Sequence, residues 1–431
     1  MLESIFKLSE NGTSVRREVL GGLTTFVTMA YIVVVNPRIL SETGMPIEGV
    51  LFATCLSAAV ATLLMGLLAN YPIALAPGMA LNAYFTYAVV LGMGVPWQTA
   101  LGVVFLSGVA FVLLTVTRVR EQIVNGIPEC IKQATPAGIG MFIAFIGLRN
   151  GGLVVADPNT FVTLGKFSDA QVQTVCLGIL LTAALVGRKV AGAILLGILG
   201  TAAVAVARGL GDWPAQLVSI PDPSGTFLQL DLAAALRLGL LEFLFVFLFV
   251  DLFDSVGTLL GVCEQAGLVK DGKIPRASRA LLADGIGTVF GAASGTSTVT
   301  SYIESAAGVA AGARTGLSSI VVGGLFLAAI FFSPLVAAIP TPAAAPALVI
   351  VGALMARSIA AVKWEDFTEA LPAFVIILTT PLTFSVATGL SLGLITFSAV
   401  KLAAGKRGEI SLLLWTLTAI FLFRYIYLAL S

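Results

Sequence analysis

The stretch GTSTVTSYIES, residues 295–305, places one carboxylate, Glu304, among small and hydroxyl-bearing residues. If this stretch is helical, the threonines four and eight residues before Glu304 share one face with it. The chain is 58% hydrophobic, and an ionisable side chain inside a membrane segment costs roughly 2.5–3.5 kcal/mol. A helix cap or an ion pair would be a purely structural explanation, but the nearest basic residue in the run, Arg314, is ten positions away. We predict that Glu304 binds a solute. The hydroxyl residues expected beside it are Thr296, Thr300 and Ser301.

A second cluster, DLFDSVG, interrupts a strongly apolar run at its middle. Asp251 and Asp254 are three residues apart, so a helix carries both on one side. Two acids within one membrane span are hard to explain by packing, and at least one is expected to face a polar cavity. The residues alone do not decide which aspartate meets a solute and which handles a proton.

The third cluster, LAPGMALNAYF at residues 75–85, combines backbone breakers with an amide side chain. Pro77 has no backbone N–H, and Gly78 relaxes the chain, so a short extended piece followed by a half-helix is expected. Backbone amides freed at such a break point into the membrane midplane and can bind a ligand. Asn82 adds a side-chain amide. We predict that Gly78 and Asn82 take part in the same site.

Together these side chains suit a small polar solute that is not an anion. Ionised carboxylates only accept hydrogen bonds, so a ligand with N–H donors fits them better than sulfate or a carboxylate does. The chain has no histidine, so proton handling is expected to fall to Asp251, Asp254 or Glu304. Phosphate-loop and zinc-type motifs are missing, and the four cysteines are scattered. No metal and no cofactor is expected.

Composition identifies the elements that must position these residues. With 431 residues, 11% charged residues and a mean hydropathy of +1.01, the chain is too apolar for a soluble domain. About 20 apolar residues are needed for each spanning helix, and the apolar runs give fourteen candidate spans. One further run, 410–430, either spans the membrane or lies at its interface. We predict an all-α polytopic membrane protein.

The distribution of basic residues gives an orientation. Placing the N-terminus in the cytoplasm puts 18 of the 24 Lys and Arg residues on the cytoplasmic side, as the positive-inside rule requires. The N-terminal stretch has no cleavable-signal pattern. A net charge of +1 gives no reason to expect nucleic acid as a partner.

The two halves of the chain echo one another. The broken segment at 71–85 occupies the position in the first half that 291–305 occupies in the second, and the Pro-rich run at 127–148 resembles that at 339–359. Two halves of seven spans have opposite orientations, and inverted repeats with paired broken helices indicate a transport site at the midplane. Small residues that serve only helix packing are the alternative explanation.

The motifs LAPGMALNAYF, DLFDSVGTLLG and GTSTVTSYIESAAGVAAGARTGLSS resemble those of the AzgA-like purine permeases of the nucleobase–ascorbate transporter superfamily. Residues 24–37 and 371–393 follow the same pattern, so the resemblance covers nearly the whole chain. It implies two inverted seven-helix repeats divided into a core and a gate, with short strands in the broken third and tenth segments. The core would comprise 1–117 and 237–340, and the gate would comprise 118–236 and 341–431.

The resemblance also implies roles for the residues singled out above. Glu304 would be the acid that binds the purine ring, and Asn82 the amide that recognises it. Asp254 lies where other superfamily members carry a substrate-binding acid, and Asp251 belongs to the same pattern, so their roles stay open. Implied partners are a purine nucleobase (adenine, guanine or hypoxanthine), a proton, membrane lipid and a second copy of the chain bound through the gate.

The expected function is import of purine nucleobases across the inner membrane by proton symport, with an elevator-like or rocking motion of core against gate. An anion transporter of the related sulfate-permease type is the alternative, but it would predict a basic midplane. An intramembrane protease that pairs Glu304 with Asp251 or Asp254 would need two carboxylates sharing a proton. No hydrolase signature supports that reading, so no enzyme activity is expected.

Overall fold

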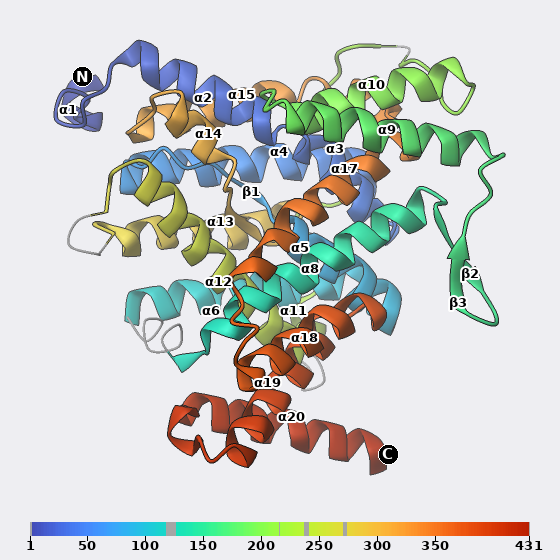
Figure 1. Ribbon diagram of the computed structural model, residues 1–431. Coiled ribbons are helices and arrows are strands. Elements are labelled where there is room, and N and C mark those ends of the chain that lie inside the picture. Colours follow the sequence, from blue (N-terminus) through green and yellow to red (C-terminus); the bar gives the residue numbers. More distant parts are fainter. Residues whose placement is uncertain (1, 118–125, 215, 237–240, 270–273, 431) are drawn as a thin grey trace. The chain divides into compact units, whose positions relative to one another are not determined.

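The computed structural model is built mainly of helices (Figure 1). It describes residues 2–117, 126–214, 216–236, 241–269 and 274–430. Within these ranges eight helices are long and apolar enough to cross a membrane, and five further apolar helices are shorter. The prediction of a polytopic helical membrane protein is confirmed at this level.

The chain divides into two compact units. The first comprises residues 1–116 and 146–350, and the second comprises residues 117–145 and 351–431. The division into core and gate at residues 117, 236 and 340 concerns a different property, relative movement, and stays a prediction.

In the first half of the chain, short strands interrupt the series of helices. The elements are α1 (Leu2–Phe6), α2 (Val15–Met29), α3 (Ile32–Ser41), α4 (Ile47–Leu64), the π-helix η1 (Met65–Ala69), β1 (Leu75–Pro77), α5 (Met79–Ala83), the π-helix η2 (Tyr84–Gly92), α6 (Trp97–Thr117), α8 (Glu129–Asn150), β2 (Val154–Asp157), β3 (Phe161–Leu164), α9 (Ala170–Gly187), α10 (Ala193–Ala207) and α11 (Leu232–Ala235).

The second half has the same character. Its elements are α12 (Leu241–Gln265), α13 (Ala277–Ser294), β4 (Val299–Ser301), α14 (Ser305–Ala310), α15 (Gly316–Ala329), α16 (Ser333–Ala338), α17 (Thr341–Met355), the 3-10 helix η4 (Ala356–Ala361), α18 (Phe367–Leu382), α19 (Val386–Ala403), the 3-10 helix η5 (Arg407–Glu409) and α20 (Leu412–Leu430). The apolar run 410–430 is therefore mostly helical, and whether it spans the membrane stays open.

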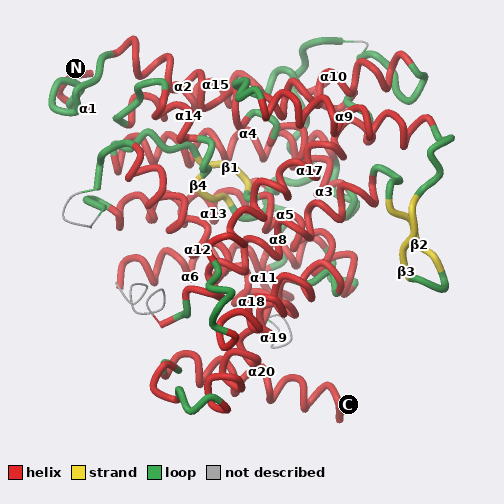
Figure 2. Tube along the Cα trace, in the orientation of Figure 1, coloured by secondary structure: helices red, strands yellow, loops and turns green. Residues whose placement is uncertain are grey.

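The two broken segments meet inside the first unit. Strands β1 and β4 pair antiparallel, with Ala76 opposite Thr300 (Figure 2). The pairing extends at both ends, because the Gly78 N–H donates to Thr298 O at 2.9 Å and the Tyr302 N–H donates to Ala74 O at 2.9 Å. Extended backbone is tolerated at membrane depth only where its polar groups are satisfied by protein. Each broken segment thus supplies hydrogen bonds that the other lacks.

A threonine on the preceding helix supports each strand in the same way. Thr62 of α4 donates to Leu75 O at 3.0 Å and accepts from the Leu75 N–H at 2.9 Å. Thr288 of α13 donates to Val299 O at 2.9 Å and accepts from the Val299 N–H at 3.2 Å. The units α4–β1–α5 and α13–β4–α14 therefore use one construction twice.

Helix α14 lies against α2 at a contact that requires glycine (Figure 1). A Cβ added at Gly308 would lie 2.1 Å from the Thr25 hydroxyl and 2.5 Å from Gly21 O. The two helices can therefore approach closely only because residue 308 has no side chain. Gly312 follows the end of α14 with φ +110°.

A hairpin between α8 and α9 was not predicted. Strands β2 and β3 pair antiparallel from Val154 opposite Leu164 to Asp157 opposite Phe161. Phe161 at the turn has φ +65° and is 86% exposed. The alternation of this stretch is too short and too mixed to stand out between two apolar runs.

Helices α18, α19 and α20 pack in sequence within the second unit. The Phe384 ring contacts the rings of Phe142 and Phe145 at centroid distances of 5.6 and 5.4 Å. The Ser391 and Tyr425 hydroxyls are 2.7 Å apart. Aromatic contacts and paired hydroxyls thus tie α8, α19 and α20 together in this unit.

Candidate functional site

Glu304 stands at the junction of the second broken segment. It follows β4 and is the residue immediately before helix α14. The Tyr31 hydroxyl donates a hydrogen bond to Glu304 Oε1 at 2.6 Å. The carboxylate is half-buried, and no ion pair to it is present among the residues described. Glu304 Oε2 is thereby left as a hydrogen-bond acceptor.

Asp254 reaches the same strand from helix α12. The Thr300 hydroxyl donates to Asp254 Oδ2 at 3.0 Å, and Asp254 is half-buried like Glu304. Asp251, one turn earlier, is completely buried. The structure therefore brings Asp254 to β4 at the side chain of Thr300 and places Asp251 within the packed interior.

Asn82 joins the site from the first broken segment. The Ser297 hydroxyl donates to Asn82 Oδ1. Asn82 Nδ2 is buried and has no hydrogen-bond partner in the part of the chain that the structure describes. Gly78 immediately precedes α5, and a Cβ there would lie 2.4 Å from Thr300 Cγ2. Asn82 thus holds a spare donor, and Gly78 lets the two segments approach.

The expectation that Thr296, Thr300 and Glu304 share a helical face is wrong. Residues 299–301 form a strand, and the helix begins only at Ser305, so the four-residue spacing does not apply. Alternate strand residues point to opposite sides. Thr300 accordingly meets α12, whereas the Ser301 hydroxyl donates to Asp284 Oδ2 of α13 at 3.4 Å.

Thr296 lies outside the strand and belongs to a separate contact. Its hydroxyl accepts from Asn36 Nδ2 at 2.9 Å, and Asn36 Nδ2 also donates to Thr54 Oγ1 at 2.7 Å. This contact anchors the segment before β4 to α3 and α4. Thr296 is therefore a positioning residue.

Sequence reasoning missed Tyr31 and Asp284. Tyr31 lies in the short break between α2 and α3. Asp284 is fully buried and accepts from the Ser301 hydroxyl of β4. An isolated tyrosine and an isolated aspartate in apolar helices were the only signals.

No metal centre accompanies these residues. In the described ranges, no three His, Cys, Asp or Glu side chains gather in a way that would hold a metal ion. The Glu304 and Asp254 carboxylates can accept hydrogen bonds and exchange protons.

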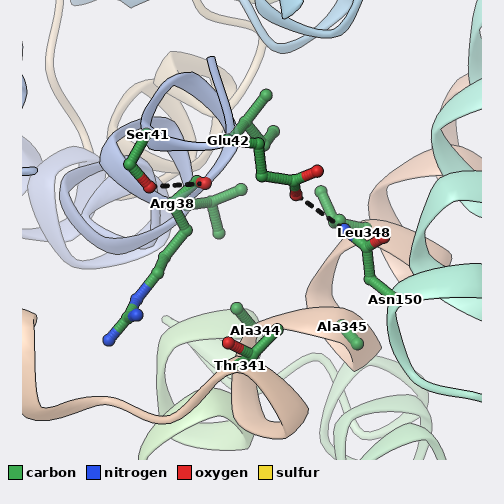
Figure 3. A pocket seen from close by; sticks show the side chains of 10 residues that line it. Arg38, Ser41, Glu42, Asn150, Thr341, Ala344, Ala345 and Leu348 are labelled. Carbon is green, nitrogen blue, oxygen red and sulfur yellow. Dashed lines mark hydrogen bonds between the residues drawn. The ribbon is translucent and has the colours of Figure 1, made fainter. Parts of the chain in front are cut away.

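A cavity of about 360 Å³ lies at the C-terminal end of α3 (Figure 3). Arg38, Ser41 and Glu42 line it from α3, and Asn150 lines it from the end of α8. Helix α17 contributes Thr341, Ala344, Ala345 and Leu348. None of these residues was singled out from the sequence.

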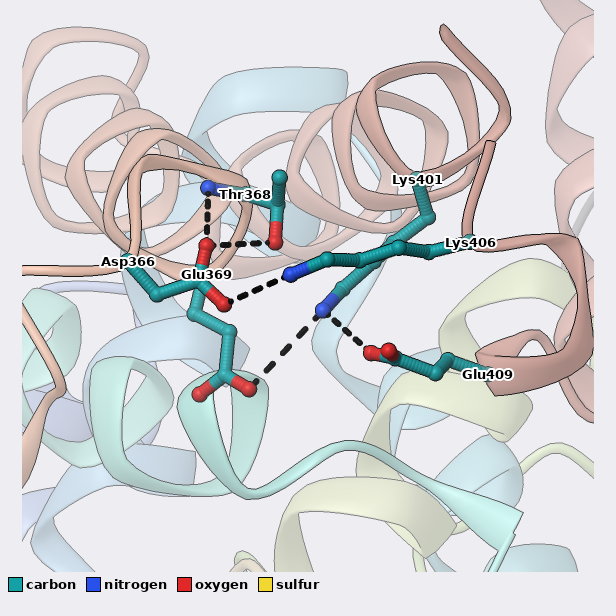
Figure 4. Close-up of polar contacts among 6 residues, drawn as sticks. All are labelled: Asp366, Thr368, Glu369, Lys401, Lys406 and Glu409. Atoms are coloured by element: carbon teal, nitrogen blue, oxygen red, sulfur yellow. Dashed lines mark hydrogen bonds and ion pairs between the residues drawn. The ribbon is translucent and has the colours of Figure 1, made fainter. Parts of the chain in front are cut away.

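The second unit carries a polar cluster of its own (Figure 4). Lys401 is only 1% exposed and lies 2.5 Å from a Glu409 oxygen and 3.9 Å from a Glu369 oxygen. Lys406 Nζ donates to Asp366 Oδ2 at 3.1 Å. These contacts join α18, α19 and the turn before α20. The cluster therefore fastens the helix ends of this unit.

The fold is that of a multi-pass helical membrane protein with two paired broken segments. It is similar to the transmembrane domain of a cyanobacterium bicarbonate transporter, BicA, with a TM-score of 0.64. The match covers 86% of this chain and 97% of that one at 15% sequence identity, so the likeness concerns the fold alone.

The sequence comparisons define the family. The model of the Permease family matches residues 16–392, and the chain belongs to this family. The adenine permease AdeP of Escherichia coli is 42% identical over 99% of this chain and 96% of its own. The guanine/hypoxanthine permease PbuO of Bacillus subtilis is 46% identical over 94% of this chain and 96% of its own length. The chain is therefore a transporter and not an enzyme.

Proposed function

We propose that this protein imports purine nucleobases by proton symport. The observation that carries the proposal is the pair of half-buried carboxylates at β4, Glu304 and Asp254, each with an acceptor position to offer. Full-length relatives named for adenine and for guanine/hypoxanthine narrow the ligand class to purines.

The hydrogen-bonding capacity of the site matches a purine base. Purines carry N–H donors, which suit Glu304 Oε2 and the Asp254 carboxylate, together with ring-nitrogen or carbonyl acceptors. Asn82 Nδ2 supplies a buried donor without a partner among the described residues. Leaving that donor unpaired is costly, and an acceptor on the ligand would satisfy it.

The proposal divides the two aspartates between substrate and proton. Asp254 contacts the base, because its carboxylate accepts a hydrogen bond from Thr300 of strand β4, close to Glu304 in the sequence. Asp251 serves proton coupling from its buried position one turn away. Glu304 follows strand β4 and Asp254 accepts from Thr300 of that strand, so protonation of either carboxylate changes the charge that the base meets.

The proposed architecture has fourteen spans in two inverted seven-helix repeats. Its support is the repeated construction of α4–β1–α5 and α13–β4–α14, each with its threonine bonded to the strand. Tyr31, Asn82, Asp254 and Glu304 all fall within the proposed core segments, 1–117 and 237–340. An elevator-like or rocking motion would then carry an intact site past the gate segments, 118–236 and 341–431.

The proposed setting is the inner membrane, with the N-terminus in the cytoplasm and lipid around the spans. The excess of Lys and Arg in the segments assigned to the cytoplasm supports this orientation. A homodimer through the gate follows from the resemblance to other superfamily members and is proposed on that ground alone.

Uptake into cells that lack their own purine permeases tests the function. Radiolabelled adenine, guanine, hypoxanthine, uracil and sulfate are supplied separately, with and without a proton ionophore. We expect that the cells take up at least one purine and that the ionophore abolishes this uptake. Sulfate uptake without purine uptake would instead favour the anion transporters that share this fold. Purine uptake that ignores the ionophore would remove proton coupling from the proposal.

A further inference from the structure

The cavity at the end of α3 has the size of a ligand site. Its volume of about 360 Å³ falls within the range of about 300–1,000 Å³ typical of small-molecule pockets. Residues of α3 and α17 line it, together with Glu42 directly after α3 and Asn150 at the end of α8 (Figure 3). All of its lining residues belong to the first unit.

The polar groups of this cavity are held in place by a small network. Asn150 Nδ2 donates to Glu42 Oε1 at 2.9 Å (Figure 3). The Tyr87 hydroxyl donates to the same oxygen at 2.7 Å. Asn150 Nδ2 also lies 3.2 Å from the Tyr87 hydroxyl. Both hydrogen bonds use Oε1, so Glu42 Oε2 remains an acceptor at the cavity wall.

Arg38 fixes the opposite wall. Its guanidinium donates to Ala337 O at 2.7 Å and to Ile339 O. These carbonyls lie just before α17, so the contact sets where the α17 residues meet the cavity. Thr341, at the first position of α17, adds a hydroxyl to the lining.

The remaining lining is aliphatic and suits the faces of a flat ring. It consists of Val35, Ile39, Ala344, Ala345 and Leu348. Apolar walls with a few fixed polar groups are the usual composition of a small-molecule site. One fixed carboxylate, an amide and a hydroxyl between such walls match a planar ligand that carries both N–H donors and acceptors.

The cavity lies on the same helix as the central site. Tyr31, which binds Glu304, directly precedes α3, whereas Glu42 directly follows it. The separation along the helix is roughly 16 Å at 1.5 Å per residue. A second, more open cavity of about 550 Å³ shares Arg38 and Thr341 with the first and reaches Trp213, which is 71% exposed. A more open cavity at the protein surface thus adjoins the first one.

We infer that the cavity between Glu42, Asn150 and Thr341 is a second purine-binding site, occupied before the base reaches Glu304. This inference rests on the proposed function, since it takes the same ligand class. Glu42 accepts a hydrogen bond from an N–H of the base, and the Thr341 hydroxyl donates one to a ring nitrogen or carbonyl. The aliphatic residues cover the ring faces. The site raises the local concentration of substrate next to the central site.

Counting bound bases on the purified full chain in lipid nanodiscs tests the inference. Tritiated adenine and tritiated hypoxanthine are titrated in turn up to millimolar concentration. We expect two bases per chain in the wild type and one in Glu304→Gln. Glu42→Gln keeps an oxygen for Tyr87 and Asn150 but turns a donor toward the cavity. It should weaken the second site roughly ten- to hundredfold while the central site keeps its affinity.

The double variant Glu304→Gln/Glu42→Gln should bind no base in this range. Glu48→Gln is the matched control, because Glu48 is an exposed acid on α4 that does not line the cavity; it should bind two. If Glu42→Gln fails to fold, Ala344→Trp fills the cavity and serves in its place.

The outcomes separate the two ideas. One base in the wild type and none in Glu304→Gln would overturn the second site and leave the proposed function standing. Two bases in both Glu42→Gln and Ala344→Trp would also overturn it. No purine bound by the wild type would contradict the proposed function itself, and the second site with it.

Discussion

The Tyr31 hydroxyl lies 2.6 Å from Glu304 Oε1 and joins the first helical break to the second broken segment. These residues are 273 positions apart in the sequence, so the site exists only after both halves of the chain have packed together. The tyrosine fixes one carboxylate oxygen, and the proposed function assigns the other oxygen to the ligand.

Removing this hydroxyl should weaken substrate binding without unfolding the protein. A hydrogen bond to a charged group contributes about 1.5–3 kcal/mol, so Tyr31→Phe should raise the Kd for the purine roughly tenfold or more. Equilibrium binding of a tritiated purine measures this. Tyr425→Phe removes a hydroxyl paired with Ser391 in the other unit and should leave the Kd unchanged. Equal Kd values for Tyr31→Phe and the wild type would contradict the assigned role.

The two aspartates of α12 should separate into substrate and coupling residues. Asp254→Asn should raise the purine Kd at least about tenfold, because a charge-assisted acceptor is lost. Asp251→Asn should bind purine within about threefold of the wild type yet lose ionophore-sensitive accumulation. Measuring both binding and accumulation for each variant decides the matter. The reverse pattern would exchange the two roles.

The contact between α2 and α14 should tolerate no side chain at residue 308. A Cβ there would sit 2.1 Å from the Thr25 hydroxyl, and overpacking of this kind costs typically about 1–3 kcal/mol. Gly308→Ala should therefore lower the melting temperature of the purified protein. Gly324→Ala is the matched control, since nothing lies within 4 Å of a Cβ at Gly324. Equal melting temperatures for the two variants would show that α14 does not pack in this way.

Acid should weaken the second unit through Asp366. Hydrogen bonds from Thr368 and the nearby Lys406 ammonium hold the pKa of the Asp366 carboxyl below its usual range (Figure 4). A depressed folded-state pKa stabilises the fold at pH values above the unfolded pKa of about 3.9. That contribution is lost as the pH falls from there through the folded-state pKa.

Asp366→Asn keeps the helix cap but removes the charge. Its melting temperature should lie below that of the wild type by a constant margin between about pH 5 and 7, and the margin should shrink below about pH 4. Glu365→Gln, an exposed neighbour, should match the wild type throughout. A margin that grows on acidification would reverse the sign and contradict the assignment.

The sequence predicted a helical membrane protein and its two broken segments because both leave strong local signals. The apolar runs are long enough to span a bilayer, and Pro77 followed by Gly78 indicates a break in a helix. The number of fourteen spans stays a prediction. The side on which each residue points was predicted less well. Thr296 and Thr300 were placed on one helical face with Glu304, but helix α14 begins only at Ser305, Thr300 lies in strand β4, and Thr296 precedes that strand.

Partners from distant segments left almost no local signal. Tyr31 and Asn150 contact residues more than a hundred positions away, and Asp284 contacts Ser301 in strand β4. Only tertiary packing determines those contacts. The roles of Glu304, Asp254 and Asn82 stay predictions, although the structure now supplies the geometry on which they depend.

The central claim is that Glu304 binds the purine. Its most direct test compares the binding of tritiated adenine and hypoxanthine to purified wild type and to Glu304→Gln, with Glu264→Gln, an exposed acid near the end of α12, as control. We predict that the high-affinity component weakens at least about tenfold in Glu304→Gln and is unchanged in Glu264→Gln. A Glu304→Gln protein that binds purine with wild-type affinity would contradict the account.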